Sequence, residues 1–304
     1  MTQFRRLAIL DVETRGGEAV RIEGLRIGFD ILKTRTTTTN TATIEAWNLN
    51  ADTRARILER NAYCTLSAGY EDDTGPGVLF VGRAQAIVHE RASPAIITRI
   101  ECQDGVQELR EIRVTLSYAA GTSLRQVLAG LAAKLSLPFR PLGAVTGEYP
   151  NGYAYAGPIR DALDQVCRRG NLEWSIQNQE LQVIPRRGST ARTAFLISPQ
   201  TGLVRSPERI NYIEGFLDGD AVPAAFVDDS SKAQKRQIRR ETRRGDEPAL
   251  RITALLQPDA IPGDRIVLES ADVSGAFLID SVRHVGDTRG RPWYSELELM
   301  DNAD

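Results

Sequence analysis

Side chains that could do chemistry are few in this 304-residue chain, and they are widely spaced. The two histidines, His89 and His284, each fall in a segment with the alternating pattern of a β-strand. Neither has a second ligand at metal-binding spacing, since the adjacent Glu90 points to the opposite side of its strand. We therefore predict that the chain binds neither a metal ion nor another cofactor.

Motifs for nucleophilic catalysis, metal-dependent hydrolysis and phosphate binding are also missing. The sequence contains no G-x-S-x-G, H-E-x-x-H, Walker A or G-x-G-x-x-G motif. Carboxylates are plentiful, so a glycosidase pair stays open on sequence alone. Such a pair needs a cleft with aromatic side chains that stack on sugars, and aromatic residues make only 6% of the chain. Trp47, Trp174 and Trp293 each fall in an expected strand as packing residues. The prediction is that this protein is not an enzyme.

One charged segment is a candidate binding surface. Ser231 and Gln234 form a capping box and Gly245 is a stop signal, which predicts a surface helix over 232–244. Its basic residues share one face: Lys232, Lys235, Arg236, Arg239, Arg240 and Arg243. This basic stripe is either a solvated helix face, a docking surface for an acidic neighbouring subunit, or a phosphate-binding surface. The net charge of −2 gives no overall attraction to nucleic acid.

The cysteines and the N-terminal residues both favour a protein that is kept in the cytoplasm. Cys64, Cys102 and Cys167 lie among apolar neighbours, as expected of buried free thiols in a reducing environment. The first apolar run, 7–10, is too short for a secretion signal or a membrane span. We expect a chain that is made and kept in the cytoplasm and does not insert into a membrane.

The elements that position these residues fall into three modules, which predict a mainly β, α+β multidomain protein. Residues 1–105 are β-rich, residues 106–188 form a small α/β module with two capped helices, and residues 189–304 return to β with a polar insertion over 216–248. Alternating patterns predict strands near 25–33, 42–47, 62–70, 78–89, 95–102, 265–269, 276–284 and 293–299.

Several motifs occur in an order that is recognisable. They are G-L-R-I-G-F-D-I-L-K-T at 24–34, A-T-I-E-A-W-N-L-N-A-D-T-R-A-R-I at 42–57, L-S-A-G-Y-E at 66–71, L-F-V-G at 79–82, I-P-G-D at 261–264 and H-V-G-D-T-R-G-R-P-W at 284–293. In this combination the chain resembles bacteriophage tail baseplate hub proteins, which are related to the hub of contractile tails and to the spike-bearing protein of type VI secretion systems. None of the motifs is catalytic.

The resemblance implies a homotrimer in which each subunit supplies two tube-like antiparallel β-barrel or sandwich domains around the inserted α/β domain. Three chains then form a pseudo-sixfold ring that lines the tail channel, joins the hexameric tail tube or distal tail protein, and carries the trimeric central spike protein. The tape measure protein and the baseplate wedge are further candidate partners, and genomic DNA is met only in transit. The implied location is the virion tail baseplate, after assembly in the host bacterial cytoplasm.

The expected mechanism is interface formation, in which open strand edges and the I-P-G-D turn meet neighbouring subunits. Two alternatives from other functional classes remain. One is a tail-associated cell-wall hydrolase, and the other is a polyanion-binding protein that acts through the helix 232–244.

Overall fold

The structure, a computed structural model, describes residues 5–13, 19–58, 62–72, 75–105, 109, 111–186, 188–190, 192, 194–210 and 249–301. The predicted basic stripe at 232–244, and with it the polar insertion 216–248, lies outside these residues. Among the residues described, no helix is both long and apolar enough to cross a membrane.

The N-terminal module is built from antiparallel strands with one short helix. Its elements are β1 (Arg6–Glu13), β2 (Ala19–Ile22), β3 (Ile27–Thr34), β4 (Thr41–Trp47), α1 (Ala51–Ile57), β5 (Tyr63–Tyr70), β6 (Gly75–Ala92) and β7 (Ala95–Gln103). Strand β4 shows why the prediction worked, because Ala42, Ile44 and Ala46 are buried while the residues between them are half-exposed. Helix α1 begins at Asn50, whose side chain accepts a hydrogen bond from Thr53 N at 2.7 Å.

The middle of the chain has a separate core that runs from Leu109 to Val183. Its elements are β8 (Arg113–Tyr118), β9 (Thr122–Ser123), α3 (Leu124–Leu135), β10 (Phe139–Pro141), β11 (Glu148–Tyr149), β12 (Tyr153–Pro158), α4 (Ile159–Arg169), β13 (Leu172–Gln177) and β14 (Glu180–Pro185). The predicted capping box of Ser123 and Gln126 is formed at the start of α3. Both helices pack their apolar faces against this α/β module's sheets, where β10, β14 and β13 form the largest.

The C-terminal module follows as β15 (Phe195–Ile197), β16 (Glu208–Ile210), β17 (Ala249–Leu255), β18 (Arg265–Glu269), β19 (Ser274–Asp287) and β20 (Trp293–Asp301). Strands β18, β19 and β20 are the three strands that the alternation predicts near the end of the chain. Strand β19 is longer at both ends than the predicted 276–284, because its first half pairs with β18 from Ser274 and its second half pairs with β3 as far as Asp287.

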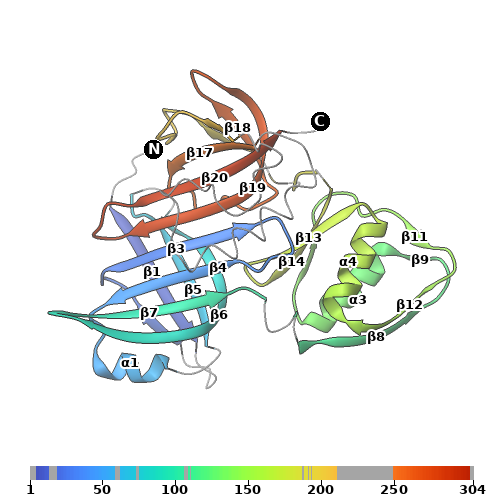
Figure 1. Cartoon of the computed structure of the whole chain (residues 1–304), viewed down its shortest axis with the longest axis horizontal. Helices are drawn as coiled ribbons and strands as arrows, with labels where there is room; N and C mark the ends of the chain where they lie inside the picture. Colours follow the sequence, from blue (N-terminus) through green and yellow to red (C-terminus); the bar gives the residue numbers. More distant parts are fainter. Residues whose placement is uncertain are drawn as a thin grey trace, which may run out of the picture.

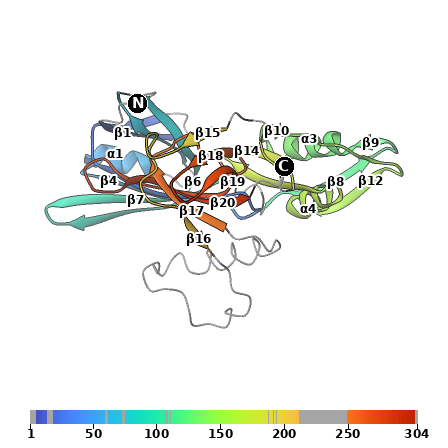
Figure 2. The same cartoon turned by 90° about the horizontal axis from the view of Figure 1, so that it is seen from above.

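The two β modules are joined in one large open sheet. Its strand order is β16-β17-β20-β19-β3-β4-β7-β6-β5-β1-β2, with β18 and β15 branching off at β19. Figures 1 and 2 show this sheet beside the α/β module. The mainly β architecture is confirmed, but the described strands close no barrel, in contrast to the barrel expectation. The reason is that β3 uses its second edge to pair with β19, so the sheet continues into the other module.

The sheet contains an internal repeat. Strands β4, β7, β6 and β5 lie side by side in the N-terminal module, and β17, β20, β19 and β18 repeat this order in the C-terminal module. The first strand of each set has a further neighbour, β3 beside β4 and β16 beside β17. Both long strands also shift register against the next strand by one residue, β6 at Gln85 and β19 at Asp280. Each chain therefore holds two copies of one strand arrangement.

Candidate functional site: strand edges and module junctions

The seam between the two β modules is the pairing of β3 with the second half of β19. Seven residue pairs form it, from Ser281 opposite Thr34 to Asp287 opposite Gly28. On the face away from the core, Arg283 Nε donates to Asp30 Oδ1 at 2.8 Å, and its guanidinium also lies 3.7 Å from Glu296. The hydrogen bond to Asp30 raises the pKa of Arg283 above its usual value, although burial opposes it. The seam is thus an ordinary antiparallel ladder reinforced by an ion pair.

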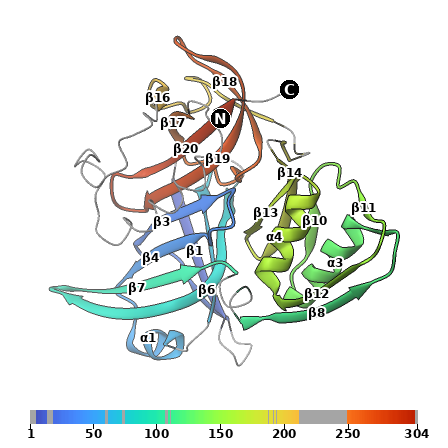
Figure 3. The same cartoon turned by 45° about the vertical axis from the view of Figure 1, so that its right-hand side comes forward.

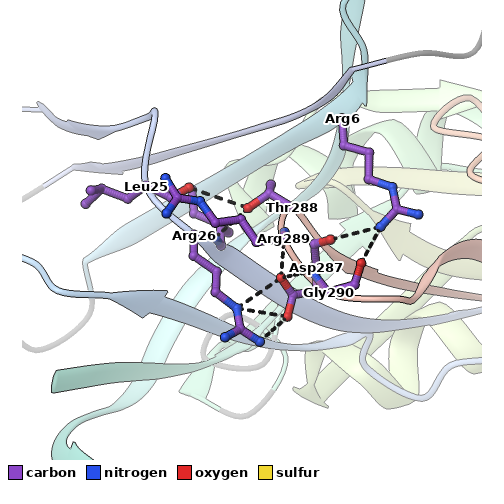
Figure 4. Close-up of polar contacts among 8 residues, drawn as sticks. Arg6, Leu25, Arg26, Asp287, Thr288, Arg289 and Gly290 are labelled. Atoms are coloured by element: carbon purple, nitrogen blue, oxygen red, sulfur yellow. Dashed lines mark hydrogen bonds and ion pairs between the residues drawn. The ribbon is translucent and has the colours of Figure 1, made fainter. Parts of the chain in front are cut away.

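The turn after β19 clamps the same seam, as Figure 4 shows. The carboxylate of Asp287 accepts from Arg26 Nη2 at 2.7 Å and from the backbone N–H groups of Arg289 and Gly290 at 2.9 and 2.8 Å. Burial alone would raise the pKa of Asp287, but the bonds from Arg26 and the two N–H groups hold it below its usual value. Arg6, from β1, donates to Gly290 O at 2.7 Å. The H-V-G-D-T-R-G-R-P-W motif is therefore a clamp within the chain.

Thr288 completes this clamp through the backbone of the N-terminal module. Its N–H donates to Ile27 O at 3.0 Å, and its Oγ1 accepts from Ile27 N at 3.0 Å. A residue of the C-terminal turn thereby satisfies both backbone groups of Ile27, which begins β3. The start of β3 is fixed by a residue more than 250 positions away in the chain.

Trp293 connects the apolar cores of the two β modules. It belongs to β20, yet it packs in the N-terminal core with Phe29, whose ring centroid is 5.4 Å away, and with Tyr70 at 6.4 Å. The Arg6 guanidinium covers its ring at 5.5 Å. Trp293 is 3% exposed, so the two modules share a continuous apolar interior at this point.

The two histidines occupy equivalent positions of the internal repeat. His89 lies four residues after the bulge of β6, and its Nδ1 is 3.0 Å from Thr98 Oγ1 on β7. His284 lies four residues after the bulge of β19, and its Nδ1 is 2.8 Å from Ser295 Oγ on β20. Burial, with the nearby charge of Lys33, lowers the pKa of His284 to about 3. Both histidines therefore pair with a hydroxyl on the next strand.

The I-P-G-D turn is used within the chain. Asp264, 4% exposed, accepts from Thr190 Oγ1 at 2.5 Å and from Arg192 Nη1 at 3.0 Å. Burial raises its pKa, and these two donors oppose the rise. The carbonyl of Pro262 accepts from Gln182 Nε2 of β14 at 2.9 Å. The turn thus ties the C-terminal module to the α/β module.

A second contact, almost entirely polar, joins the α/β module to the N-terminal one. Asn40 donates to Ile176 O at 2.8 Å, and Gln177 Nε2 donates to Thr34 O at 2.7 Å. At the tip of the β13–β14 hairpin, Gln179 Nε2 donates to the buried carboxylate of Asp104 at 2.7 Å. Burial raises the pKa of Asp104 to about 6, and the hydrogen bonds from Gln179 and Asn178 and the charge of Lys33 limit the rise. The apolar residues of this hairpin pack in the core of the α/β module, and hydrogen bonds tie its tip to the N-terminal module.

Asp280, at the bulge of β19, gives a pH-dependent prediction. Burial raises its pKa to about 6 against the opposing charge of Arg35, while Glu298 and Glu173 add to the rise. Between about pH 4 and 6 the folded chain therefore binds this proton more readily than the unfolded chain, so the free energy of unfolding falls as the pH rises. Asp280→Asn removes this loss of stability. We expect the free energy of unfolding of the variant, taken relative to wild type, to be about 2 kcal/mol higher at pH 8 than at pH 4.

Denaturant unfolding of both proteins at the two pH values measures this difference. Asparagine has nearly the same size and shape as aspartate, so the substitution changes the charge at position 280 while keeping the side-chain volume. Arg35 also pairs with Glu173, at 2.7 Å, so we expect it to keep a charged partner in the variant. An equal stability difference at pH 4 and pH 8 would contradict the assigned titration.

The structure does not test the predicted site residues. The basic stripe stays a prediction, because Lys232, Lys235, Arg236, Arg239, Arg240 and Arg243 lie outside the described residues. Within the part of the chain that is described, no group of three His, Cys, Asp or Glu side chains could hold a metal ion. A cleft of about 310 Å³ lies where the three modules meet, but its arginines, Arg140 and Arg192, already pair with Glu180 and Asp264. All three cysteines are buried and free.

The sequence reasoning missed the internal repeat of the sheet, in which β6 and β19 occupy equivalent positions. Strand β6 ends in a hairpin with β7 whose tip, residues 91–96, projects beyond the last paired residue of β4 (Figure 1). The signal that could have found the repeat is the matching pattern around the two histidines, A-I-V-H at 86–89 and S-V-R-H at 281–284.

Solved structures with this arrangement of elements come from phage tails and from type VI secretion. The 43 kDa tail protein of prophage MuSo2 from Shewanella oneidensis matches with a TM-score of 0.64 at 12% identity, over 97% of this chain and 100% of that one. A tail protein from Neisseria meningitidis matches with a TM-score of 0.65 at 13% identity, over 98% and 97%. This chain has the fold of phage tail proteins.

A component of the type VI secretion system of Escherichia coli has the same tail-protein fold. It matches with a TM-score of 0.54 at 11% identity, over 99% of this chain and 78% of that one, and is itself described as structurally similar to T4 tail proteins gp27 and gp5. No protein-family model and no curated protein sequence matches the chain. At these identities the likeness concerns the fold, and the function has to be argued from the geometry.

Proposed function

We propose that this protein is a structural component of a phage-type tail, and that it acts as the trimeric hub of the baseplate. The observation that carries the proposal is the internal repeat, in which two copies of one strand arrangement are fused edge to edge in one sheet. Three such chains contain six quasi-equivalent units, so the trimer can match a hexameric tube on one side and a threefold spike on the other. The shared fold with tail proteins supports this role.

The hub lines the tail channel with the face of the sheet that points away from the core. On this face, charges from the two modules are paired: Arg99 with Glu45 at 2.8 Å, Arg283 with Asp30, and Arg251 with Glu298 at 2.8 Å. A wall whose cations are already compensated would have little affinity for a passing polyanion such as genomic DNA. This supports transit of DNA rather than its binding.

The partners in this proposal are a second and third copy of the chain, a tail tube or distal tail protein above, and a central spike protein below. The tape measure protein and the baseplate wedge are secondary candidates. The site of action is the virion tail baseplate, reached after assembly in the host cytoplasm.

Mass measurement of the full chain, alone and with its tube partner, tests the proposal. We expect a trimer at micromolar concentration, or on addition of the tube protein, by analytical ultracentrifugation. A chain that stays monomeric in both conditions and joins no tail complex would overturn the proposal. A cell-wall hydrolase would instead lower the turbidity of a peptidoglycan suspension at the same protein concentration, and we expect no such change.

A further inference from the structure

Two arginines at one end of the large sheet lack the acidic partners that arginines on its face have. On the face, Arg99, Arg251 and Arg283 each pair with a carboxylate of a neighbouring strand. Arg289 and Arg291 lie in the turn between β19 and β20, and both are exposed. Neither has a carboxylate partner among the residues that the structure describes. Unpaired positive charge is therefore gathered at this turn.

The equivalent turn of the internal repeat carries a similar charge. The turn between β6 and β7 corresponds to the turn between β19 and β20, and Arg91 lies directly beside it. Arg91 is exposed, and within the described part of the chain it too has no carboxylate partner. Figures 1 and 3 show both turns at the end of the sheet that lies away from the α/β module. We call Arg91, Arg289 and Arg291 the arginine rim.

The clamp around Asp287 holds the β19–β20 turn in one shape. Gly290, which lies between the two arginines of the turn, donates its N–H to Asp287 Oδ1 at 2.8 Å and accepts from Arg6 at 2.7 Å. The N–H of Asp287 donates to Pro292 O at 2.9 Å and closes the turn. Because the backbone is already fixed, the exposed guanidinium groups lose less conformational freedom when a partner binds.

The repeat indicates what kind of partner meets this end of the sheet. The α/β module occurs once in each chain, and it contacts the opposite end of β3 through the bond from Gln177 Nε2 to Thr34 O. A trimer therefore presents three α/β modules at that end. At the other end it presents the two equivalent turns of each chain, which makes six quasi-equivalent turns. Six such turns match a hexameric partner.

We propose that the arginine rim docks onto acidic side chains exposed at the end of the hexameric tail tube. This inference rests on the proposed trimeric hub and gives the chemistry of its tube-facing surface. A guanidinium can form two parallel hydrogen bonds with a carboxylate, so acidic loops of the tube are the partner that the rim fits. One exposed ion pair contributes little, but three arginines from each of three copies act together in a ring-shaped contact.

An exposed apolar residue lies beside these charges. Leu25 is 36% exposed, and its carbonyl is 3.5 Å from Thr288 Oγ1 of the β19–β20 turn, as Figure 4 shows. Protein interfaces combine arginine with apolar side chains, whereas a surface that only attracts mobile counterions needs no apolar contact. Leu25 thus favours a protein partner over a free polyanion.

The experiment is biolayer interferometry between the full-length chain and the tail tube protein of the same phage. Reversing both charges of the turn, Arg289→Glu with Arg291→Glu, should weaken binding at least about tenfold in dissociation constant, and Arg91→Glu should weaken it further. The difference from wild type should shrink as NaCl is raised from about 50 to about 500 mM, because salt screens exposed charges.

The matched control is Arg125→Glu. Arg125 is an exposed arginine of α3 in the α/β module, and it also has no carboxylate partner among the described residues. We expect it to change tube binding by less than about twofold. In the turn itself, the only side-chain contact that is lost is the 3.5 Å hydrogen bond from Arg289 Nη2 to Gly24 O. Circular dichroism melting checks that every variant keeps its fold.

The outcomes separate this inference from the proposed function. If wild type trimerises and binds the tube protein, but the rim variants bind as well as Arg125→Glu, the docking surface is wrong while the hub stands. If the rim variants lose the trimer in ultracentrifugation, the rim is a subunit contact and the inference is overturned. If wild type neither trimerises nor binds the tube protein, the proposed function fails first.

A DNA duplex of about 20 base pairs is the second probe, since arginines also bind phosphates. If wild type binds the duplex, and the rim variants lose this binding while tube binding is unchanged, the rim is a polyanion site and the inference is overturned. Loss of tube binding confined to the rim variants, with the trimer intact, supports the docking surface.

Discussion

Trp293→Ala should lower the free energy of unfolding by about 4 kcal/mol, in the range measured for large aromatic residues removed from protein cores. The indole is 3% exposed and fills the space between Phe29 and Tyr70, so its removal leaves a cavity at the point where the two β modules share their core. The Arg6 guanidinium over the ring would lose its aromatic partner as well. Urea unfolding followed by circular dichroism measures the effect.

The neighbouring residue serves as the control for this prediction. Tyr294→Ala removes an aromatic ring from the opposite face of the same strand, where the side chain is half-exposed, and should cost less than half as much. Because Trp293 comes from β20 but packs with residues of β3 and β5, its loss should destabilise both modules in one transition. Two separated transitions, with only the C-terminal one shifted, would show that the modules do not share a core.

Asp287→Ala should lower the free energy of unfolding by about 3 kcal/mol at neutral pH. The variant loses the ion pair with Arg26 and the acceptor for two turn N–H groups, and hydrogen bonds to charged groups contribute more than neutral ones. The carboxylate is only 12% exposed, so solvent screens it little. Denaturant unfolding at pH 7 gives the magnitude.

The pH dependence of this effect has a definite sign. The folded-state pKa of Asp287 lies below the ordinary value of 3.8, so its contribution is present above that pH and is lost as the pH falls through the folded-state pKa. The difference between wild type and Asp287→Ala should therefore shrink below about pH 4. Glu23→Ala is the control, because the Glu23–Arg21 pair is exposed on both sides and its loss should change stability by less than about 0.5 kcal/mol. A similar cost for both variants would argue against the clamp.

Local signals predicted much of the secondary structure. The alternation of apolar and polar residues predicted the strands around Ile44 and Leu268, because one side of each strand is buried and the other is more exposed. The capping box at Ser123 marked the start of its helix, since the side chain satisfies a backbone N–H there. These features depend on residues within one or two turns of each other.

Contacts between residues that are far apart in the sequence could not be predicted from local patterns. The motif around Asp287 was visible in the sequence, but its role was not, because its partners Arg6 and Arg26 lie more than 250 positions away. The pairing of β3 with β19 leaves no local pattern in the sequence, so the β modules were expected as two separate barrel or sandwich domains. The candidate basic stripe at 232–244 remains a prediction, since the structure does not describe it.

The one-residue bulges at Gln85 and Asp280 impose a constraint on chain length rather than on chemistry. The bulge of β19 lies where the strand passes from β18 to β3, and the bulge of β6 lies just after β5 leaves the strand. Because side chains alternate between faces, losing or gaining one residue there would exchange the faces of every residue that follows in the strand. In relatives of this chain, the number of residues between each bulge and its histidine should therefore be preserved while the residues themselves change freely.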